Sequence, residues 1–370
     1  MVPARKIFAI LLICVPLWVG CTPRENAPAS APPDPSVSPA PITTTVSPTP
    51  FPSATALPST GTPSPETTAT AIPTAVPYYA YSIDYLTGRA YGDGQLEIVE
   101  TLAENSWFTR YLFRYTSDGL WIYGFLNVPV AEGPAGPGPY PVIIALHGYI
   151  DPAIYATLDY TTEYADGLAR AGYIVFHPNL RNYPPSDEGD NLFRVGMAID
   201  VLNLIGLVQT QWGQFPLLAQ AAPEQLGMWG HSMGGGIITR VITVTDKVLA
   251  AVLYAPMSGD ERQNFEGING WSDGLRGNEE LAVPLEALDI ISPAYFFDRI
   301  TTPISLHHGR ADELVPLTWS LQTCAALQAL YKPVECTYYD DMPHTFYGEG
   351  NDTFVANVIL FFNRVLKGEG

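Results

Sequence analysis

The sequence predicts an α/β fold, built on a mostly parallel, doubly wound sheet of about eight strands with an antiparallel N-terminal hairpin and helices on both faces. Two observations predict this class. Short apolar runs of buried-strand type alternate with stretches of helical periodicity between residues 141 and 366, and such alternation produces a parallel sheet covered by helices. Ahead of them, strand-like runs at 110–116 and 121–128 flank Asp118-Gly119, a dipeptide typical of hairpin turns.

The elements after the hairpin follow from local patterns. Short apolar or β-branched runs predict strands at 141–146, 172–176, 226–229, 250–255, 303–307 and 334–339. Segments with apolar residues near helical spacing predict helices at 159–171, 190–211, 233–244, 318–331 and 353–366. Residues 257–291 fit neither pattern, so we expect an irregular insert there.

The composition limits the possible functions. The chain has 370 residues, 47% of them hydrophobic, and 37 Asp and Glu against 18 Lys and Arg give a formal net charge of −19. A chain of this length can build one domain of roughly 250–300 residues with a large core. Phosphate binding needs clustered Lys and Arg, so the acidic balance argues against a nucleic acid partner.

Residues 1–21 have the pattern of a secretory signal peptide. Two basic residues precede an apolar run at 7–19, which is too short to span a bilayer comfortably. The run leads to Gly20-Cys21, and this resembles the bacterial lipoprotein signal, in which the Cys is lipidated and becomes the new N-terminus. The resemblance implies export to the cell surface or periplasm with Cys21 as the lipid anchor. The alternative is an ordinary signal peptide with an incidental Cys.

Residues 22–77 predict a disordered linker, because they consist almost wholly of Pro, Ser, Thr and Ala and lack the apolar surface that offsets the entropy of ordering. Frequent prolines favour extended polyproline II. Residues 1–77 carry equal numbers of basic and acidic side chains, so the whole net charge lies on 78–370. We therefore expect a tether that holds an acidic domain, residues 78–370, away from a membrane contacted only through the lipid anchor.

The segment Gly230-His231-Ser232-Met233-Gly234 follows an apolar run and opens a predicted helix. In that context G-x-S-x-G is a nucleophile elbow, a strained strand-to-helix turn that presents the Ser side chain to a crevice. Side chains at positions 230 and 234 would collide with neighbouring backbone, so both must be Gly. We expect Ser232 to be a nucleophile, with the Met233 N–H at a helix N-terminus available to an oxyanion.

A second oxyanion donor is expected after the strand at 141–146. His147-Gly148-Tyr149 follows that strand, at the position where folds with this elbow place a backbone N–H near the oxyanion. The N–H of Tyr149 is the predicted donor, and His147 itself is interpreted as a packed loop histidine.

A Ser nucleophile needs a base, and the base needs an acid that orients it. The chain order Ser, acid, His favours His344 as the base among six histidines, since it alone lies in the loop before the last predicted helix. Asp312 follows the strand at 303–307 and is the predicted acid, with its neighbour Glu313 as the alternative. We expect His307 and His308 to be packed side chains.

The chain resembles proteins of the α/β-hydrolase fold. The resemblance rests on the elbow, the His-Gly pair and the predicted acid and base, within the segments 117–119, 122–125, 147–148, 230–236, 309–316 and 343–346. More narrowly, the chain is similar over about residues 105–368 to the catalytic domain of the prolyl oligopeptidase (S9) family and to its dienelactone-hydrolase and acetyl-xylan-esterase relatives. The resemblance implies a catalytic triad of Ser232, Asp312 and His344. It implies a serine hydrolase that cleaves a carboxylic ester or a peptide bond through an acyl-enzyme on Ser232.

One difference from that family concerns substrates. True oligopeptidases usually carry an N-terminal β-propeller, and residues 78–107 leave no room for one between the linker and the predicted core. This favours esters or small acyl groups over peptides. The insert at 257–291, with eight acidic residues against two Arg, is interpreted either as a mobile cap over the crevice or as a plain surface loop.

Two further alternatives stay open. Cys324 and Cys336 lie on a predicted helix and the next strand, and in an exported protein they form either a disulfide or two packed thiols. An inert lipoprotein that binds a small ligand with the same fold is the alternative to a hydrolase. The residues imply no cofactor and no metal, and the expected partner is a small-molecule ester or a short peptide.

Overall fold

The computed structural model describes residues 78–369, and within them nine strands form one sheet in the order β1-β2-β3-β5-β4-β6-β7-β8-β9. The predicted signal peptide at 1–21 with Cys21, and the predicted linker at 22–77, lie outside the described residues. The strands are β1 (Leu96–Glu104), β2 (Phe108–Ser117), β3 (Leu120–Pro129), β4 (Tyr140–Leu146), β5 (Ile174–Pro178), β6 (Ala221–His231), β7 (Ala250–Tyr254), β8 (Ile304–Gly309) and β9 (Val334–Tyr339).

The sheet combines an antiparallel and a parallel part. β1, β2, β3 and β5 pair antiparallel in succession, whereas β5, β4, β6, β7, β8 and β9 pair parallel. This arrangement confirms the predicted fold class, a mostly parallel sheet with antiparallel strands at its N-terminal side. Parallel strands need crossover connections, and helices supply most of them.

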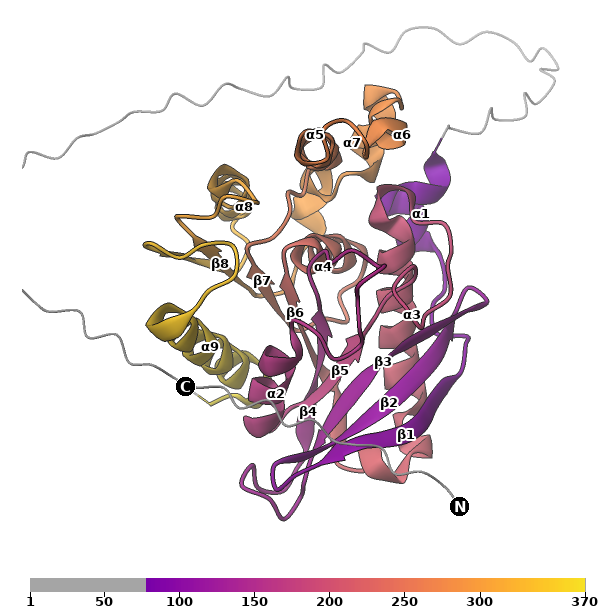
Figure 1. Cartoon of the computed structure of the whole chain (residues 1–370), viewed down its shortest axis with the longest axis vertical. Helices are drawn as coiled ribbons and strands as arrows, with labels where there is room; N and C mark the ends of the chain where they lie inside the picture. Colours follow the sequence, from indigo (N-terminus) through magenta and orange to yellow (C-terminus); the bar gives the residue numbers. More distant parts are fainter. Residues whose placement is uncertain (1–77, 370) are drawn as a thin grey trace, which may run out of the picture. The chain divides into compact units, whose positions relative to one another are not determined.

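The α-helices of the described region are α1 (Ile83–Gly88), α2 (Thr162–Arg170), α3 (Val195–Gln211), α4 (Met233–Val244), α5 (Glu261–Trp271), α6 (Asn278–Leu281), α7 (Leu285–Ile291), α8 (Leu317–Ala329) and α9 (Gly348–Phe362). They cover both faces of the sheet (Figure 1). α2 and α9 pack on one face around Leu168, Phe354 and Phe362. α3 and α4 pack on the other face, in the larger apolar core.

α3 is almost entirely enclosed by this larger core. Together with short 3₁₀ turns at its two ends it forms the stretch Leu192–Gln214, which is long and apolar enough to cross a membrane by length and composition. Within the domain, however, 83% of its most apolar window is buried. A helix that is apolar all round is expected in the core of a large domain, and the stretch has that role here.

The register of the parallel strands sets the position of the site. Leu146 of β4 pairs with Gly230 of β6, Gly230 pairs with Leu253 of β7, and Leu253 pairs with Leu306 of β8. Because these strands run in the same direction, the residues just beyond this row emerge at one edge of the sheet. Ligands of open α/β sheets bind outside that carboxyl edge.

The insert at 257–291 differs from the expectation of irregular structure, because α5, α6 and α7 occupy most of it. The side chain of Asp260 caps α5 by accepting hydrogen bonds from the backbone N–H groups of Arg262 and Gln263. Several glycines dilute the helical pattern, and only a few residues of α5 are buried, among them Phe265. A weak apolar face explains why periodicity alone did not indicate these helices.

β1 is a second difference, since the sequence patterns predicted only a hairpin before β4. Most residues of β1 are exposed, and Leu96 is its single fully buried residue. It is one of the two edge strands of the sheet, and charged side chains on such edges oppose unwanted pairing with other chains. An edge strand with little burial therefore lacks the alternation by which strands are recognised.

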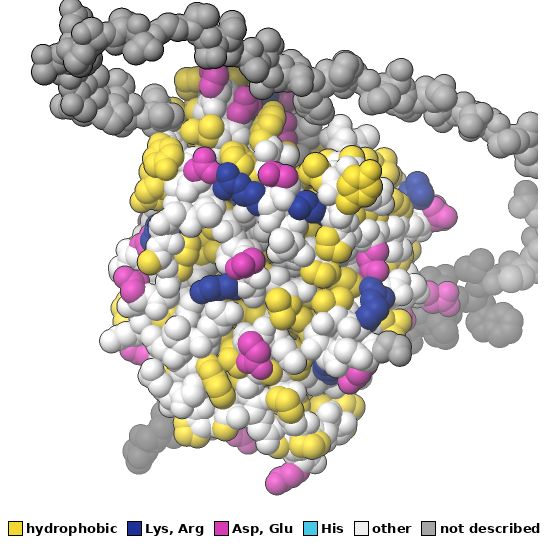
Figure 2. Space-filling model, turned by 180° about the vertical axis from the view of Figure 1, so that it is seen from behind, with side chains coloured by type: hydrophobic (Ala, Val, Ile, Leu, Met, Phe, Trp, Pro, Cys, Tyr) yellow, Lys and Arg dark blue, Asp and Glu magenta, His cyan; other side chains and the backbone are white. Residues whose placement is uncertain are grey.

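Figure 2 shows the side of the domain turned away from the view of Figure 1. Lys and Arg side chains lie there in separate spots among acidic and apolar ones. Among the described residues drawn on this side, basic side chains form no continuous surface.

Candidate active site

Ser232 lies between β6 and α4 on a strained turn. Its backbone has φ 54° and ψ −113°, a combination that is uncommon for a residue with a side chain. The turn is held from both sides, because the Ser232 N–H donates to Tyr254 O at 2.8 Å and Ser232 O accepts from Gly236 N–H and Met257 N–H at 3.1 Å each. Strain that the surroundings enforce in this way is typical of active sites, and the geometry is that of a nucleophile elbow.

The two elbow glycines are required by close backbone contacts. A Cβ atom at Gly230 would lie 2.6 Å from the carbonyl carbon of Gly234, and a Cβ atom at Gly234 would lie 2.5 Å from Leu146 O. Both distances are below any real Cβ contact. Only glycine allows β4, β6 and the start of α4 to approach this closely, as the sequence predicted.

Two backbone N–H groups are available beside Ser232. Met233 is the first residue of α4, and the first N–H groups of a helix have no acceptor within it. Tyr149 follows β4, and its N–H has no backbone or side-chain acceptor within residues 78–369. The loop that carries it touches the elbow, because a Cβ atom at Gly148 would lie 3.2 Å from Ser232 Cβ.

The structure brings the predicted base and acid together. His344 Nδ1 lies 2.7 Å from Asp312 Oδ2, and the two residues are 32 positions apart in the chain. The Asp312 carboxylate is completely buried, and the His344 side chain is 12% exposed. Glu313, the alternative acid, is exposed, and Asp340 pairs with Arg310 at 2.8 Å.

The third member of the predicted triad lies on a neighbouring loop. Within the described residues the structure records no hydrogen bond between the Ser232 hydroxyl and His344, and the link between their two segments is His231. His231 precedes Ser232, and its ring lies 4.5 Å from the His344 ring, centroid to centroid. Catalytic hydrogen bonds often form only when substrate is bound.

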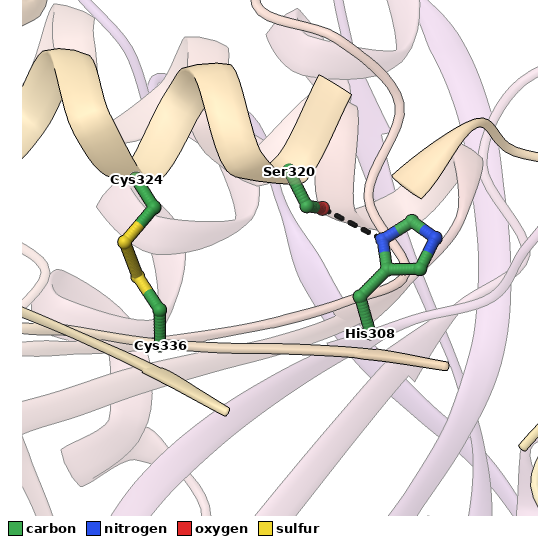
Figure 3. The surroundings of a disulfide bond; sticks show 4 residues. All are labelled: His308, Ser320, Cys324 and Cys336. Carbon is green, nitrogen blue, oxygen red and sulfur yellow. Dashed lines mark hydrogen bonds between the residues drawn. A yellow bond between two sulfur atoms is a disulfide. The ribbon is translucent and has the colours of Figure 1, made fainter. Parts of the chain in front are cut away.

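Asp312 has a further partner that sequence reasoning missed. His308 Nε2 lies 3.0 Å from Asp312 Oδ2, and His308 Nδ1 accepts from Ser320 Oγ of α8 at 2.7 Å (Figure 3). Burial by itself raises the pKa of the Asp312 carboxyl, but the hydrogen bonds from His308 and His344 outweigh it and hold this pKa well below its ordinary value. Asp312 therefore stays ionised and accepts the proton of His344 Nδ1.

His231 and Tyr160 were also missed. His231 is 1% exposed, and its Nε2 lies 2.8 Å from His344 O. The Tyr160 hydroxyl contacts His231 Nδ1 and also lies 3.2 Å from Thr345 Oγ1. Burial, with a smaller effect from His344, lowers the pKa of His231 to about 3, so its imidazole is neutral. No sequence pattern pairs residues 71 and 113 positions apart, and only the fold reveals these contacts.

Ser232 and Met233 line a cavity of about 740 Å³. The helical insert forms much of its wall, together with the loop after β4 and the start of α3. Most of the lining is apolar, including Met197, Met257, Phe265, Ile268, Trp271 and Leu275. The charged side chains at the cavity are Asp151, Arg194, Arg276 and Glu280. The cavity can accept a bulky apolar group next to the nucleophile.

The insert contacts the predicted oxyanion loop directly. Arg276 Nη1 donates to the Tyr149 hydroxyl, and the Arg276 guanidinium lies 5.1 Å from the centroid of the Tyr149 ring. Both residues also line the cavity. The insert therefore covers part of the crevice in this structure, with its contact to Tyr149 at the rim.

A disulfide joins Cys324 of α8 to Cys336 of β9 (Figure 3), which decides between the two alternatives for this pair. It lies one turn beyond Ser320, so it fastens the helix that supports His308. Within residues 78–369, no group of three or more His, Cys, Asp or Glu side chains has an arrangement that could hold a metal ion.

Comparison with known proteins agrees with this geometry. Residues 217–369 match the prolyl oligopeptidase family, and residues 141–283 match the alpha/beta hydrolase fold. The chain is 27% identical over 255 residues to the uncharacterized peptidase YtmA of Bacillus subtilis, covering 67% of this chain and 91% of that protein.

Solved structures show the same fold. Acetyl xylan esterase 1 from Thermoanaerobacterium is similar with a TM-score of 0.56 at 19% identity, over 77% of this chain and 92% of that one. The acylaminoacyl peptidase of Pyrococcus horikoshii is similar with a TM-score of 0.54 at 23% identity, over 71% of this chain. The matched region spans only 43% of that peptidase.

Proposed function

This chain is an α/β-hydrolase with a catalytic domain like that of the prolyl oligopeptidase family, and we propose that it hydrolyses carboxylic esters of bulky apolar acids through an acyl-enzyme on Ser232. The proposal rests on the Asp312–His344 hydrogen bond of 2.7 Å, together with the strained elbow that places Ser232 at the wall of a largely apolar cavity. A positioned nucleophile, base and acid are the requirements for acyl transfer.

The reaction follows from the positions of these groups. His344 Nε2 takes the proton from Ser232 Oγ as the oxygen attacks the ester carbonyl, and ionised Asp312 stabilises the imidazolium that forms. The N–H groups of Met233 and Tyr149 hold the oxyanion. His344 then gives its proton to the leaving alkoxide, the alcohol departs, and water repeats the sequence on the acyl-enzyme to release the acid.

The size of the cavity supports a bulky acyl group. Ligand pockets of drug-sized molecules have volumes of roughly 300–1,000 Å³, and this cavity of about 740 Å³ falls in that range. An acetyl group would leave most of its apolar wall in contact with water. Burying apolar substrate surface against this wall stabilises the complex by about 25 cal/mol per Å².

Cleavage of a peptide or amide bond is the second candidate. The same triad can attack either carbonyl, and the match to the prolyl oligopeptidase family together with the peptidase name of the Bacillus relative favours it. An amine leaves less readily than an alkoxide of an activated ester. Amide substrates therefore depend more strongly on protonation of the leaving group by His344.

Export belongs to the same proposal. The basic start, the apolar run at 7–19 and Cys21 support a lipid-anchored protein held at the cell surface or in the periplasm by the segment 22–77. Replacing Cys21 by Ser in the full chain is expected to move the protein from the membrane fraction to the soluble exported fraction. An unchanged membrane fraction for C21S contradicts lipid anchoring at this residue.

The test of the reaction compares nitrophenyl esters of acetic and 4-phenylbutyric acid with a peptidyl nitroanilide, using the full chain and Ser232→Ala. We expect higher kcat/KM for the bulky ester and no turnover by S232A. Ser258→Ala is the matched control, because its hydroxyl bonds Gln263 and does not line the cavity. Turnover by S232A, or none by the unmodified chain, overturns the proposal, and the latter result favours an inert ligand-binding protein.

A further inference from the structure

We infer that Tyr160 and His231 position the base of the reaction, by fixing the backbone carbonyl of His344 through a directed chain of hydrogen bonds. The inference rests on the proposed function, since it assigns a role within that site. Its geometry comes from three separate segments of the chain. Tyr160 lies in the loop before α2, His231 ends β6, and His344 lies in the loop between β9 and α9.

The direction of each hydrogen bond follows from its end points. A backbone carbonyl can only accept, so the contact of 2.8 Å requires His231 Nε2 to carry the proton that His344 O receives. His231 is neutral, and its other nitrogen, Nδ1, must then be an acceptor. The Tyr160 hydroxyl consequently donates to Nδ1. One tautomer of His231 satisfies both contacts.

The same reasoning applies on the other side of the His344 ring. Ionised Asp312 can only accept, so His344 Nδ1 carries a proton, and in the neutral imidazole Nε2 is then the nitrogen whose lone pair can face Ser232. Asp312 therefore holds the imidazole, and His231 holds the backbone from which the imidazole extends. With both ends held, the ring has little freedom to turn away from the nucleophile.

Packing around His231 strengthens this arrangement. The His231 ring lies 4.2 Å from the Tyr254 ring and 4.5 Å from the His344 ring, centroid to centroid. Tyr254 OH in turn accepts from the N–H of Phe346. The loop that carries the base is thus bound at residues 344 and 346 to the strands β6 and β7. A loop would otherwise be more mobile than the sheet beside it.

The hydrogen bonds from Tyr160 to His231 and from His231 to His344 also limit the positive charge near the base. During the reaction His344 becomes positively charged, and a second cation in ring contact would oppose this step. Burial lowers the pKa of His231 to about 3, so this imidazole is neutral near pH 7. Tyr160 supplies the proton that a charged His231 would otherwise carry at Nδ1. The arrangement therefore binds the loop without repelling the imidazolium.

The test uses Tyr160→Phe in the full chain, because this change removes one hydroxyl and keeps the ring. We expect kcat for the bulky ester to fall about tenfold, the equivalent of one hydrogen bond of about 1.4 kcal/mol, while KM stays within about twofold. Tyr173→Phe is the matched control, since its hydroxyl bonds Asn363 at the opposite end of β5 from the site. Equal kcat for Y160F and Y173F overturns the inference.

A second pair of variants tests the donor itself. His231→Gln can still place an N–H toward His344 O, whereas His231→Leu cannot. We expect H231Q to keep at least tenfold more of the kcat than H231L at similar melting temperatures. Equal losses in both variants contradict a role through the carbonyl. If the unmodified chain hydrolyses none of the substrates, the proposed function fails instead, so the two failures are distinguishable.

Discussion

His308 Nε2 lies 3.0 Å from Asp312 Oδ2, the same oxygen that accepts the hydrogen bond from His344. The oxygen Oδ1 of Asp312 accepts from the backbone N–H groups of Leu314 and Val315 at 2.9 and 2.8 Å. Both carboxylate oxygens are therefore held by donors. Donors other than His344 therefore hold the Asp312 carboxylate in position, and an effective orienting group needs such independent support.

Removing the His308 donor tests this support. His308→Leu is expected to lower kcat about tenfold or more, because a hydrogen bond to a charged group is worth about 1.5–3 kcal/mol. The change is measured as kcat and KM for the bulky ester, with little effect on KM. His307→Leu is the matched control, since this buried neighbour bonds Tyr339 and Ser305 instead. Equal kcat for both variants contradicts the role of His308.

The contact between Arg276 of the insert and Tyr149 of the oxyanion loop predicts an effect on substrate binding. Arg276→Ala removes the contact with Tyr149 and is expected to raise KM for the bulky ester a few-fold, since an exposed cation–π contact contributes about 0.5–1 kcal/mol. The acetyl ester, which does not reach the insert, should change less. Arg262→Ala serves as the control, because Arg262 lies on the same insert and its ion pair is with the exposed Glu266. A uniform effect on both esters contradicts a role of the insert in acyl-group binding.

The disulfide predicts a loss of stability on its removal. Cys324 and Cys336 are 12 positions apart, and closing a loop of this size restricts the unfolded chain by about 3 kcal/mol. Replacing both by Ser is expected to lower the free energy of unfolding by about that amount, measured in urea. Some loss of kcat is expected as well, because α8 carries Ser320, the partner of His308. Unfolding at the same urea concentration with and without the bond contradicts a stabilising disulfide.

Three buried histidines predict steep acid sensitivity. Burial lowers the pKa of His177, His231 and His307 to about 3 in the folded protein, whereas in the unfolded chain it is about 6.5. Their stability contribution is fully present above pH 6.5 and is lost as the pH falls toward 3, because the unfolded chain binds more protons in between. The slope is about 4 kcal/mol per pH unit well inside that window.

Urea unfolding at pH 7, 5.5 and 4.5 measures this slope. His177→Gln should reduce the slope by about one third, since His177 is fully buried and its Nδ1 has no partner among the described residues. Equal free energies of unfolding at pH 7 and 4.5 contradict the predicted protonation states.

The sequence by itself determined the fold class and named the candidate residues of the site. β4 and β7 are buried along their whole length and are almost wholly apolar, so these strands were visible as patterns. Gly230 and Gly234 surround Ser232 because Cβ atoms there would collide with backbone of the elbow and of β4, and this requirement leaves a local motif in the sequence. The order of Ser232, Asp312 and His344 then followed from the order of the strands.

Only the tertiary structure decided which side chains support these residues. His308, His231 and Tyr160 act through contacts between segments that are distant in the chain, and a histidine packed for stability looks the same in sequence as one that holds a carboxylate. The helices of the insert at 257–291 could not be predicted from sequence patterns either, because they bury too few residues to show an apolar periodicity. Strands, helices and tight turns depend mainly on residues that are close in the sequence. Hydrogen bonds between loops depend instead on the sheet that brings the loops together.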